Sequence, residues 1–323
     1  MLEDCLAVEK LAKELKREVI VCHVLRYTPF YSTLKKVLDS GAIGKVVNVQ
    51  AVERVGYWHQ AHSFVRGNWR NAALSSPMLL QKSCHDLDMF LWLTGKHCKT
   101  VSSMGSLTWF KAENAPEGAA ERCMDCQYEK TCPYSGYNAY IKRAEEEGYF
   151  EWPTDVVTQI PTVEALKEAL KTGPYGRCVF HCDNDVVDHQ VTNMLMEDGV
   201  TVTFSMCALT SKTGRFLHIM GTEGEITGEM DENLLTVTKF GQAPEVIDTS
   251  LAKDVFGHGG GDAGLVNDLV GLFTEGNASA SRTGVEVSVE SHVVALAAEE
   301  SRLAGGKAVD IAAFRAAAEK GMA

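Results

Sequence analysis

Long apolar runs, prolines and basic residues are all scarce in this 323-residue sequence. No apolar run reaches the roughly 18 residues that a membrane span needs, and the first residues lack the pattern of a signal or transit peptide. With only 8 prolines, the chain is unlike proline-rich disordered proteins. Its 43 acidic residues exceed its 31 basic ones, and no basic stripe attracts phosphates, so nucleic acid is not expected as a partner. We therefore expect a cytoplasmic globular protein without a membrane partner.

The sequence also lacks the opening of a parallel α/β unit, which normally begins with a strand. Residues 2–15 show the leucine spacing of a helix, and the apolar run at 17–27 predicts a strand after it. The one match to G-x-G-x-x-G lies at 259–264, but it follows no buried strand, so we reject it as a nucleotide site. We interpret it as a flexible loop that begins a helix, and this loop either brings His258 toward a substrate or serves only as a helix cap.

Periodic patterns predict helices and strands along the rest of the chain. The predicted helices cover 30–38, 77–95, 163–172, 263–273 and 289–303. The predicted strands cover 45–55, 99–110, 189–196, 200–209, 216–221, 224–230 and 234–241. Antiparallel strands flanked by helices on one side predict the α+β class, with an open-faced and mostly antiparallel sheet.

The most informative segment is the predicted helix at 77–95. On a continuous helix, Gln81 and His85 project from one face, with Lys82 beside them and Asp88 one turn further on. Such a polar cluster, followed by an apolar run, is typical of a helix whose end lines a cleft. Histidine transfers protons near neutral pH, so His85 is a candidate catalytic residue. The alternative is a helix end with a hydrogen-bonded histidine.

A polar insertion at about 112–153 contains Cys123, Cys126 and Cys132, a spacing that suits three thiolate ligands. Zinc in a structural role is the favoured metal, because a long polar insertion needs a cross-link. The alternative is a set of free thiols, the usual state of cysteine in a reducing compartment. A fourth ligand is not evident from the spacing. Further candidates are Cys178, His181 and Cys182.

Five segments together are similar to the Gfo/Idh/MocA oxidoreductases, which act on sugars, inositols and related polyols with NAD or NADP. The segments are MLEDCLAVEKLAKE, VCHVLRYTPFYSTLKKVLDSGAIGKVVNVQ, RGNWR, KSCHDLDMFLWLTG and CDNDVVDHQVTNMLMEDG. The resemblance implies that residues 29–323 form a substrate-binding and oligomerisation domain like the C-terminal domain of glyceraldehyde-3-phosphate dehydrogenase. Residues 1–28 are then the remnant of a dinucleotide-binding Rossmann domain.

The resemblance also implies roles for particular residues. The family's catalytic aspartate and histidine fall on Gln81 and His85; the histidine matches, whereas an amide cannot act as a base, and Lys82 could compensate. The family's catalytic lysine, in a Glu-Lys-Pro motif, would lie upstream of Met1. The remaining positions implied to face the substrate are Arg26 and Tyr27, and those implied to face the cofactor are Trp69 and Arg70. Asp188 and His189, at the start of a predicted strand, could bind sugar hydroxyls, although 183–185 is equally well a solvated turn.

The expected reaction is hydride transfer between nicotinamide and a secondary alcohol of a sugar, inositol or glycoside-like substrate, with His85 handling the proton. NAD or NADP is not expected to bind this chain tightly on its own, and a homodimer or homotetramer through the sheet is implied by the resemblance. Three explanations are open for the absent cofactor-binding half. The reading frame begins upstream, a partner chain supplies that half, or the chain has lost its enzyme activity, and we favour the first. Two other functions stay open, namely a non-catalytic sugar-binding or scaffold protein and a redox or metal sensor built on the cysteines.

Overall fold

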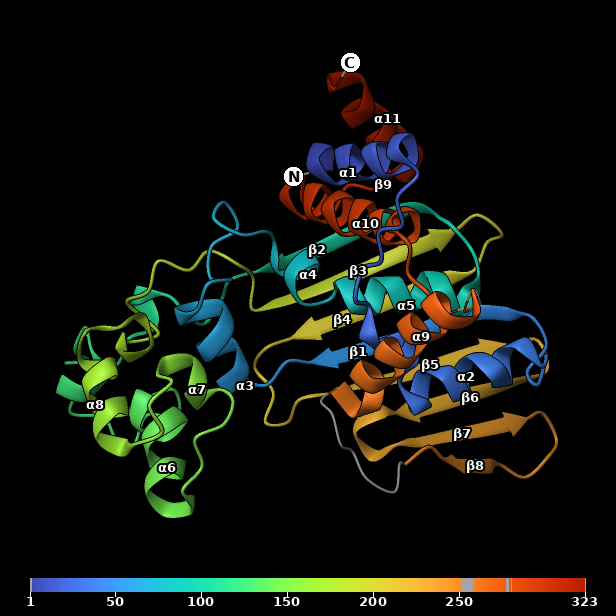
Figure 1. The fold of residues 1–323 in the computed structure, drawn as a ribbon. Helices are drawn as coiled ribbons and strands as arrows, with labels where there is room; N and C mark the ends of the chain where they lie inside the picture. Colours follow the sequence, from blue (N-terminus) through green and yellow to red (C-terminus); the bar gives the residue numbers. More distant parts are fainter. Residues whose placement is uncertain (1, 251–257, 277–278, 280, 323) are drawn as a thin grey trace.

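A mixed sheet forms the centre of this computed structural model, which describes residues 2–250, 258–276, 279 and 281–322 (Figure 1). Its strand order is β8-β7-β6-β5-β1-β4-β3-β2-β9, and every neighbouring pair is antiparallel except β1 and β4. The strands are β1 (Val46–Arg54), β2 (Cys98–Ser106), β3 (His189–Met196), β4 (Thr201–Cys207), β5 (Gly214–Gly221), β6 (Gly224–Glu229), β7 (Leu234–Lys239), β8 (Glu245–Asp248) and β9 (Val309–Asp310). The predicted α+β class is confirmed.

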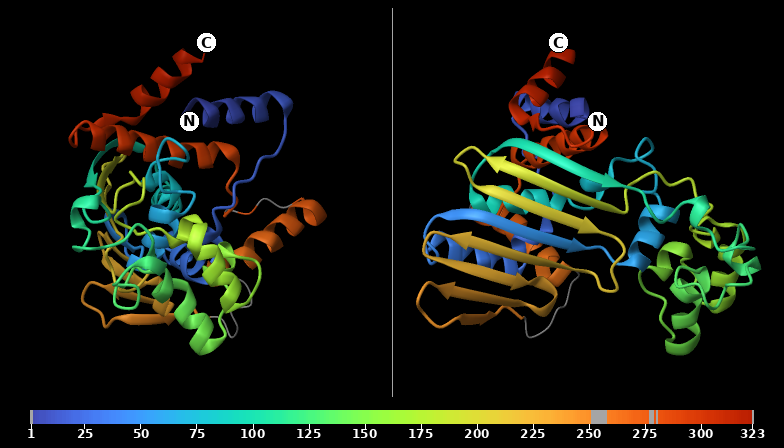
Figure 2. Two further views of the ribbon diagram at one scale, coloured as in Figure 1. Left: turned by 90° about the vertical axis from the view of Figure 1, so that its left-hand side faces the viewer. Right: turned by 180° about the vertical axis from the view of Figure 1, so that it is seen from behind.

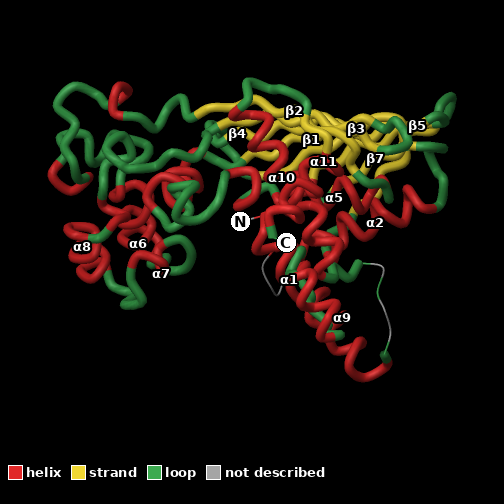
Figure 3. The backbone as a smooth tube through the Cα atoms, turned by 90° about the horizontal axis from the view of Figure 1, so that it is seen from above, coloured by secondary structure: helices red, strands yellow, loops and turns green. Residues whose placement is uncertain are grey.

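Helices cover one face of the sheet and leave the other face open (Figures 2 and 3). The covering elements are α1 (Leu2–Leu15), η1 (Val24–Tyr27), α2 (Pro29–Asp39), α4 (Met78–Gln81), α5 (Cys84–Thr94), η8 (His258–Gly260), α9 (Gly261–Glu275), α10 (Val285–Leu303) and α11 (Ile311–Gly321). Strict alternation along β3 and β4 decides which side chains meet the helices, because successive strand residues point to opposite faces. Val202 and Phe204 therefore lie in the core beneath α5 and α10, whereas Val191 and Leu195 lie on the open face.

A separate lobe, formed mainly by residues 107–188, lies beside one end of the sheet (Figure 1). It contains η3 (Ala112–Asn114), η4 (Cys123–Asp125), η5 (Tyr137–Ile141), α6 (Lys142–Glu147), α7 (Thr154–Val157), α8 (Val163–Thr172) and η6 (Pro174–Gly176), and it packs on α3 (Tyr57–His59) and η2 (Gln60–Arg66). The polar insertion predicted at 112–153 is the first half of this lobe. Two small apolar clusters, around Phe110 and around Tyr140, stabilise it.

Two expected elements differ in the structure. Residues 17–23 form no strand; Ile20 makes a single bridge to Gly284, and Val19 and Val21 share backbone hydrogen bonds with Val285 and Thr283. The predicted helix at 77–95 is two helices, α4 and α5, separated at Lys82 and Ser83. Within the described residues, no helix combines the length and apolar content needed to cross a bilayer.

Candidate active site

The break between α4 and α5 places the side chains of Lys82 and Ser83 against Glu53, a residue of β1. Ser83 Oγ donates a hydrogen bond of 2.7 Å to Glu53 Oε2, and Lys82 Nζ lies 3.4 Å from Glu53 Oε1. Gln81 ends α4 and donates its amide hydrogen bond to Ser76 O. Gln81 and His85 are therefore not one turn apart on a single helix, and the prediction of a shared helical face is wrong. The contact with Glu53, which no local pattern reveals, accounts for the break.

Arg215, on β5, joins Glu53 to Asp86 in a buried ion network. Its Nη2 lies 2.7 Å from Glu53 Oε1, and its Nε lies 2.7 Å from Asp86 Oδ1. Burial alone would raise the pKa of Glu53, but Arg215 and Lys82 outweigh it and lower that pKa to about 2. Burial, together with the Glu53 charge, raises the pKa of Asp86 to about 6 despite Arg215. Glu53 therefore carries the negative charge that holds Lys82 and Arg215 in place.

His85, the second residue of α5, lies among polar and ionisable neighbours rather than in an apolar core. Burial lowers its pKa to about 3, and the nearby charges of Arg215 and Lys82 contribute. Its Nδ1 is buried and has no hydrogen-bond partner among the described residues, and its ring meets the edge of His23 at a centroid distance of 5.6 Å. His85 is therefore neutral near pH 7.

His23, Cys84 and His85 also bring their possible ligand atoms within 4.8 Å of one another. His23 is 2% exposed, and its Nε2 lies 2.9 Å from Ser288 Oγ on α10. Burial and the charge of Asp86 raise the pKa of the Cys84 thiol to about 12. The group offers three possible ligands where a structural zinc site has four, and His23 Nε2 is already engaged with Ser288, so we interpret it as a polar cluster.

His59 is a site residue that the sequence reasoning missed. It ends α3, and its ring packs on Trp58 and Trp152 at centroid distances of 5.6 and 5.2 Å. Burial and the charge of Lys82 lower its pKa to about 3. The signal was present in the segment GYWHQAHSF, where two histidines stand among aromatic residues. His59 thus adds a second neutral imidazole to the surroundings of Lys82.

Arg26 and Tyr27, expected to face the substrate, are engaged inside the protein. Arg26 is 3% exposed and pairs with Asp88, which therefore points into the core rather than toward a cleft with His85. Tyr27 donates a hydrogen bond of 3.1 Å to Asp268 on α9. The guanidinium of Arg26 is paired with a carboxylate inside the protein, and its expected role toward a substrate stays a prediction.

Asp188 and His189 are not brought to His85. Asp188 is fully buried and accepts hydrogen bonds of 2.9 and 2.6 Å from the backbone of Thr108 and Trp109, so it holds the start of the lobe rather than a sugar. His189 begins β3, and its side chain is exposed on the open face of the sheet. His189 therefore points away from the helix-covered side, where His85 is found.

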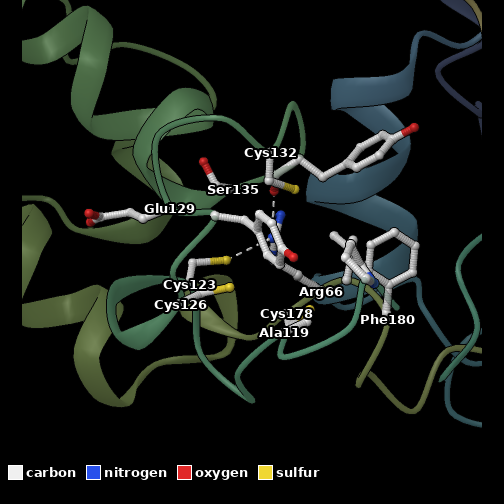
Figure 4. A pocket seen from close by; sticks show the side chains of 13 residues that line it. Arg66, Ala119, Cys123, Cys126, Glu129, Cys132, Ser135, Cys178 and Phe180 are labelled. Carbon is white, nitrogen blue, oxygen red and sulfur yellow. Dashed lines mark hydrogen bonds between the residues drawn. The ribbon is translucent and has the colours of Figure 1, made fainter. Parts of the chain in front are cut away.

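The remaining expected residues lie at the periphery. Trp69 is 49% exposed and stacks on Phe64, and Arg70 forms an ion pair of 2.9 Å with Asp183. His258 is exposed at the start of η8 and lies 2.9 Å from Asp262. The glycines after it allow close packing, because a Cβ at Gly261 would lie 2.5 Å from the carbonyl oxygen of Val24. Three expected metal ligands lie in the lobe, away from His85, around Arg66 (Figure 4): Cys123, Cys126 and Cys132.

Comparisons with known proteins agree with this architecture. Residues 35–255 match the model of the oxidoreductase family, C-terminal alpha/beta domain. The chain is 25% identical over 276 residues to the putative oxidoreductase YteT of Bacillus subtilis (strain 168), a match that covers 80% of this chain and 62% of YteT. The chain thus spans less than two thirds of that relative.

Two solved structures share the fold. Levoglucosan dehydrogenase, in complex with NADH and levoglucosan, aligns with a TM-score of 0.62 at 16% identity over 96% of this chain and 70% of that one. A super-repressor mutant of Gal80p from Saccharomyces cerevisiae aligns with a TM-score of 0.63 at 12% identity over 97% of this chain and 70% of that one. At such identities, the likeness concerns the fold alone.

Proposed function

Because this chain belongs to the Gfo/Idh/MocA oxidoreductase family, we propose that it forms the substrate side of an NAD(P)-dependent oxidoreductase. The proposed reaction transfers a hydride between nicotinamide and a secondary alcohol of a sugar, inositol or related polyol. One observation carries the proposal: a neutral His85 with an unpaired Nδ1 stands beside Lys82, in a site whose charges are fixed by Glu53 and Arg215. A neutral imidazole can accept a proton from an alcohol oxygen, and a lysine ammonium can donate a hydrogen bond to that oxygen.

The residues divide the work as follows. When bound, the nicotinamide supplies the acceptor for the hydride that leaves the alcohol carbon. His85 accepts the hydroxyl proton, so that a ketone is formed, and it returns the proton in the reverse direction. Lys82, held by Glu53, donates a hydrogen bond to the same oxygen and stabilises the negative charge that develops there. Gln81 supports the turn through Ser76 and transfers no proton.

We propose that Trp69 contacts the cofactor. Its half-exposed indole, supported from behind by Phe64, offers a flat surface on which an aromatic ring of NAD(P) can stack. Arg70 is already paired with Asp183 and contributes through that pair to the shape of the same loop. The solved levoglucosan dehydrogenase, whose structure is described as a complex with NADH and levoglucosan, supports a nicotinamide cofactor and a sugar-like substrate.

A turnover assay tests the proposal. NADH formation is measured with NAD⁺ or NADP⁺ and a panel of sugars, inositols and polyols. We expect His85→Ala to lower kcat by about 10² to 10⁴, the usual loss when acid–base help is removed. The matched control is His97→Ala, an exposed histidine just beyond α5 that pairs with Glu290. An unchanged rate for His85→Ala would remove His85 from the mechanism.

A second candidate function is sugar binding without catalysis, and the fold shared with a super-repressor form of Gal80p favours considering it. Calorimetry separates the two. The non-catalytic function would be supported by a polyol that binds, whose affinity falls in His85→Ala, and that never yields reduced cofactor. If no member of the panel binds and none is turned over, both proposals fail.

We also propose that the open face of the sheet joins copies of this chain. Exposed apolar side chains gather there on β2 and β3, where Met104 pairs across the strands with Val191, and Leu195 lies further along the same face. Such a patch favours a protein interface. The test is light scattering after gel filtration: the double change Val191→Glu and Leu195→Glu should convert a dimer or tetramer to a monomer, and a monomeric wild-type chain would contradict the proposal.

The predicted zinc ion has no part in hydride transfer. It belongs to the lobe, where the cysteines lie, and its proposed role is structural. All ten cysteines of the chain are unpaired, which favours a reducing compartment for this protein.

A further inference from the structure

Arg66 is a buried cation without a carboxylate partner among the described residues. It ends η2 and is 1% exposed. Its donors reach Arg177 O at 2.7 Å, Tyr134 O at 2.6 Å and Cys123 Sγ at 3.4 Å, while Nη1 has no partner. A charge removed from water without an opposite charge costs several kcal/mol, so this position calls for an anion.

Sulfur atoms are the nearest source of that negative charge. Arg66 lines a cavity of about 20 Å³ (Figure 4), which has room for roughly one water molecule or one metal ion. Four of the other lining residues are cysteines, and they are Cys123, Cys126, Cys132 and Cys178. Cys178 comes from a distant segment, which the bridge between Arg122 and Arg177 holds beside the first two cysteines.

Neutral thiols would not satisfy Arg66. A thiol that keeps its proton carries no net charge, and its sulfur is only a weak hydrogen-bond acceptor. A bound metal ion deprotonates the thiols that coordinate it. Four thiolates and one Zn²⁺ carry a net charge of −2, and this anionic centre would compensate the guanidinium.

We propose that the four cysteines lining this cavity bind one structural zinc ion, with Arg66 donating a hydrogen bond to a coordinating sulfur. Zinc prefers four ligands in a tetrahedral arrangement, with zinc–sulfur distances of about 2.3 Å. No three of these four sulfur atoms lie within 4.8 Å of one another in the structure, so binding would require the cysteine side chains to rotate toward the cavity. Binding releases four protons to solvent, one from each thiol.

The geometry also argues for Cys178 rather than Cys182 as the fourth ligand. Cys182 does not line the cavity, and its thiol donates to the carbonyl oxygen of Cys178 at 3.2 Å. The ion would join η4 to the segment that returns from α8, and it would stabilise a lobe with only small apolar clusters. The sequence predicts three of these ligands and offers Cys178, His181 and Cys182 as further candidates, and the lining of the cavity favours Cys178 among them.

Elemental analysis by mass spectrometry tests the proposal on protein purified without chelator under reducing conditions. We expect about one zinc per wild-type chain and less than about one-tenth for Cys126→Ser or Cys178→Ser. The matched controls are Cys182→Ser, in the same lobe, and Cys207→Ser, at the end of β4, and both should keep the metal. Loss of zinc in Cys182→Ser with retention in Cys178→Ser would overturn this ligand set.

Cobalt titration of metal-free protein gives an independent readout, because a tetrahedral cobalt–thiolate centre has strong sulfur-to-metal and d–d absorption bands. We expect these bands in wild type and in His85→Ala, and weaker cobalt binding in Arg66→Met. Less than about one-tenth zinc per wild-type chain, with no thiolate bands on adding cobalt, would overturn the site. Neither readout uses the substrate of the proposed enzyme. A failure of the zinc proposal is therefore distinguishable from a failure of the proposed enzyme function.

Discussion

Arg26 and Asp88 form a bidentate ion pair inside the protein, with Nε–Oδ2 and Nη2–Oδ1 distances of 2.7 and 2.6 Å. The two residues are 3% and 1% exposed, and the guanidinium also lies over the ring of Trp92. The pair connects η1 to α5, the helix that carries His85. It therefore determines where the candidate catalytic histidine stands without touching a substrate itself.

Replacing one partner of this pair should lower the free energy of unfolding more than replacing both partners. Arg26→Met leaves the Asp88 carboxylate buried and unpaired, and we expect the free energy of unfolding to fall by about 3 to 5 kcal/mol. The double change Arg26→Met with Asp88→Leu should recover most of that loss. Urea unfolding measures both. A single variant within about 1 kcal/mol of wild type would mean that the pair is not the structural link described here.

Glu53 should control the ionisation of Asp86. The two carboxyls share Arg215, and the charge of Glu53 helps to raise the pKa of Asp86 to about 6. Glu53→Gln removes that charge, so the pKa of Asp86 should fall. Carbon NMR of the Asp86 carboxyl across a pH titration measures it. The control is Glu229→Gln, a strand glutamate paired with Arg54, which should leave the Asp86 titration unchanged. A raised or constant pKa in Glu53→Gln would contradict the network.

Three buried histidines should make the protein sensitive to mild acid. Burial lowers the pKa of His59 and His85 to about 3 and that of His62 to about 4, from 6.5. Their contribution to stability is present above pH 6.5 and declines as the pH falls, because only the unfolded chain takes up the protons. Asp86 acts in the opposite direction, because its raised pKa means that the folded chain binds a proton there near pH 5 and the unfolded chain does not. This offsets the uptake of about one proton by the histidines.

These four groups together take up about two protons on unfolding near pH 5, which lowers the free energy of unfolding by about 3 kcal/mol per pH unit. Burial also lowers the pKa of His23, so this fourth buried histidine adds to the slope. Urea unfolding at several pH values between 7 and 5 measures the slope. His62→Phe, which keeps a ring against Tyr175, should reduce the slope by about 1.4 kcal/mol per pH unit. Stability that stays constant or rises toward pH 5 would show that these imidazoles are not buried as neutral groups.

Two glycines of α9 should respond oppositely to alanine. A Cβ at Gly261 would stand 2.5 Å from the carbonyl oxygen of Val24, so Gly261→Ala must push α9 away from η1 and should cost about 1 to 3 kcal/mol. Gly271 has no atom within 4 Å of the same position, and Gly271→Ala should stabilise the helix by up to about 1 kcal/mol. Thermal melts of the two variants measure the difference. Equal effects would contradict the packing of α9 on η1.

Sequence patterns were sufficient where one face of a regular element is buried. Alternation in residues 189–207 predicted β3, β4 and the buried face that contains Val202 and Phe204. Periodicity also predicted α2, α8, α9 and α10, with ends displaced by a few residues. The short strands β8 and β9 escaped prediction, because four or two residues are too few to show a period. The parallel pairing of β1 with β4 escaped as well, since the two segments are far apart along the chain.

His85 was recognisable from its residue type and its neighbours, but its environment was not. Local periodicity carries information about residues three or four positions apart, whereas Arg215 reaches Asp86 across 129 positions and Ser83 reaches Glu53 across 30. Those contacts interrupt the helix at Lys82 and decide the charges around His85. Similarly, the spacing of Cys123 and Cys126 predicted thiol ligands. Only the folding of the chain brings Cys178 and the buried charge of Arg66 close to these two residues. Ion pairs and hydrogen bonds between distant segments depend on the packing of whole elements, and for that reason the tertiary structure alone assigns their partners.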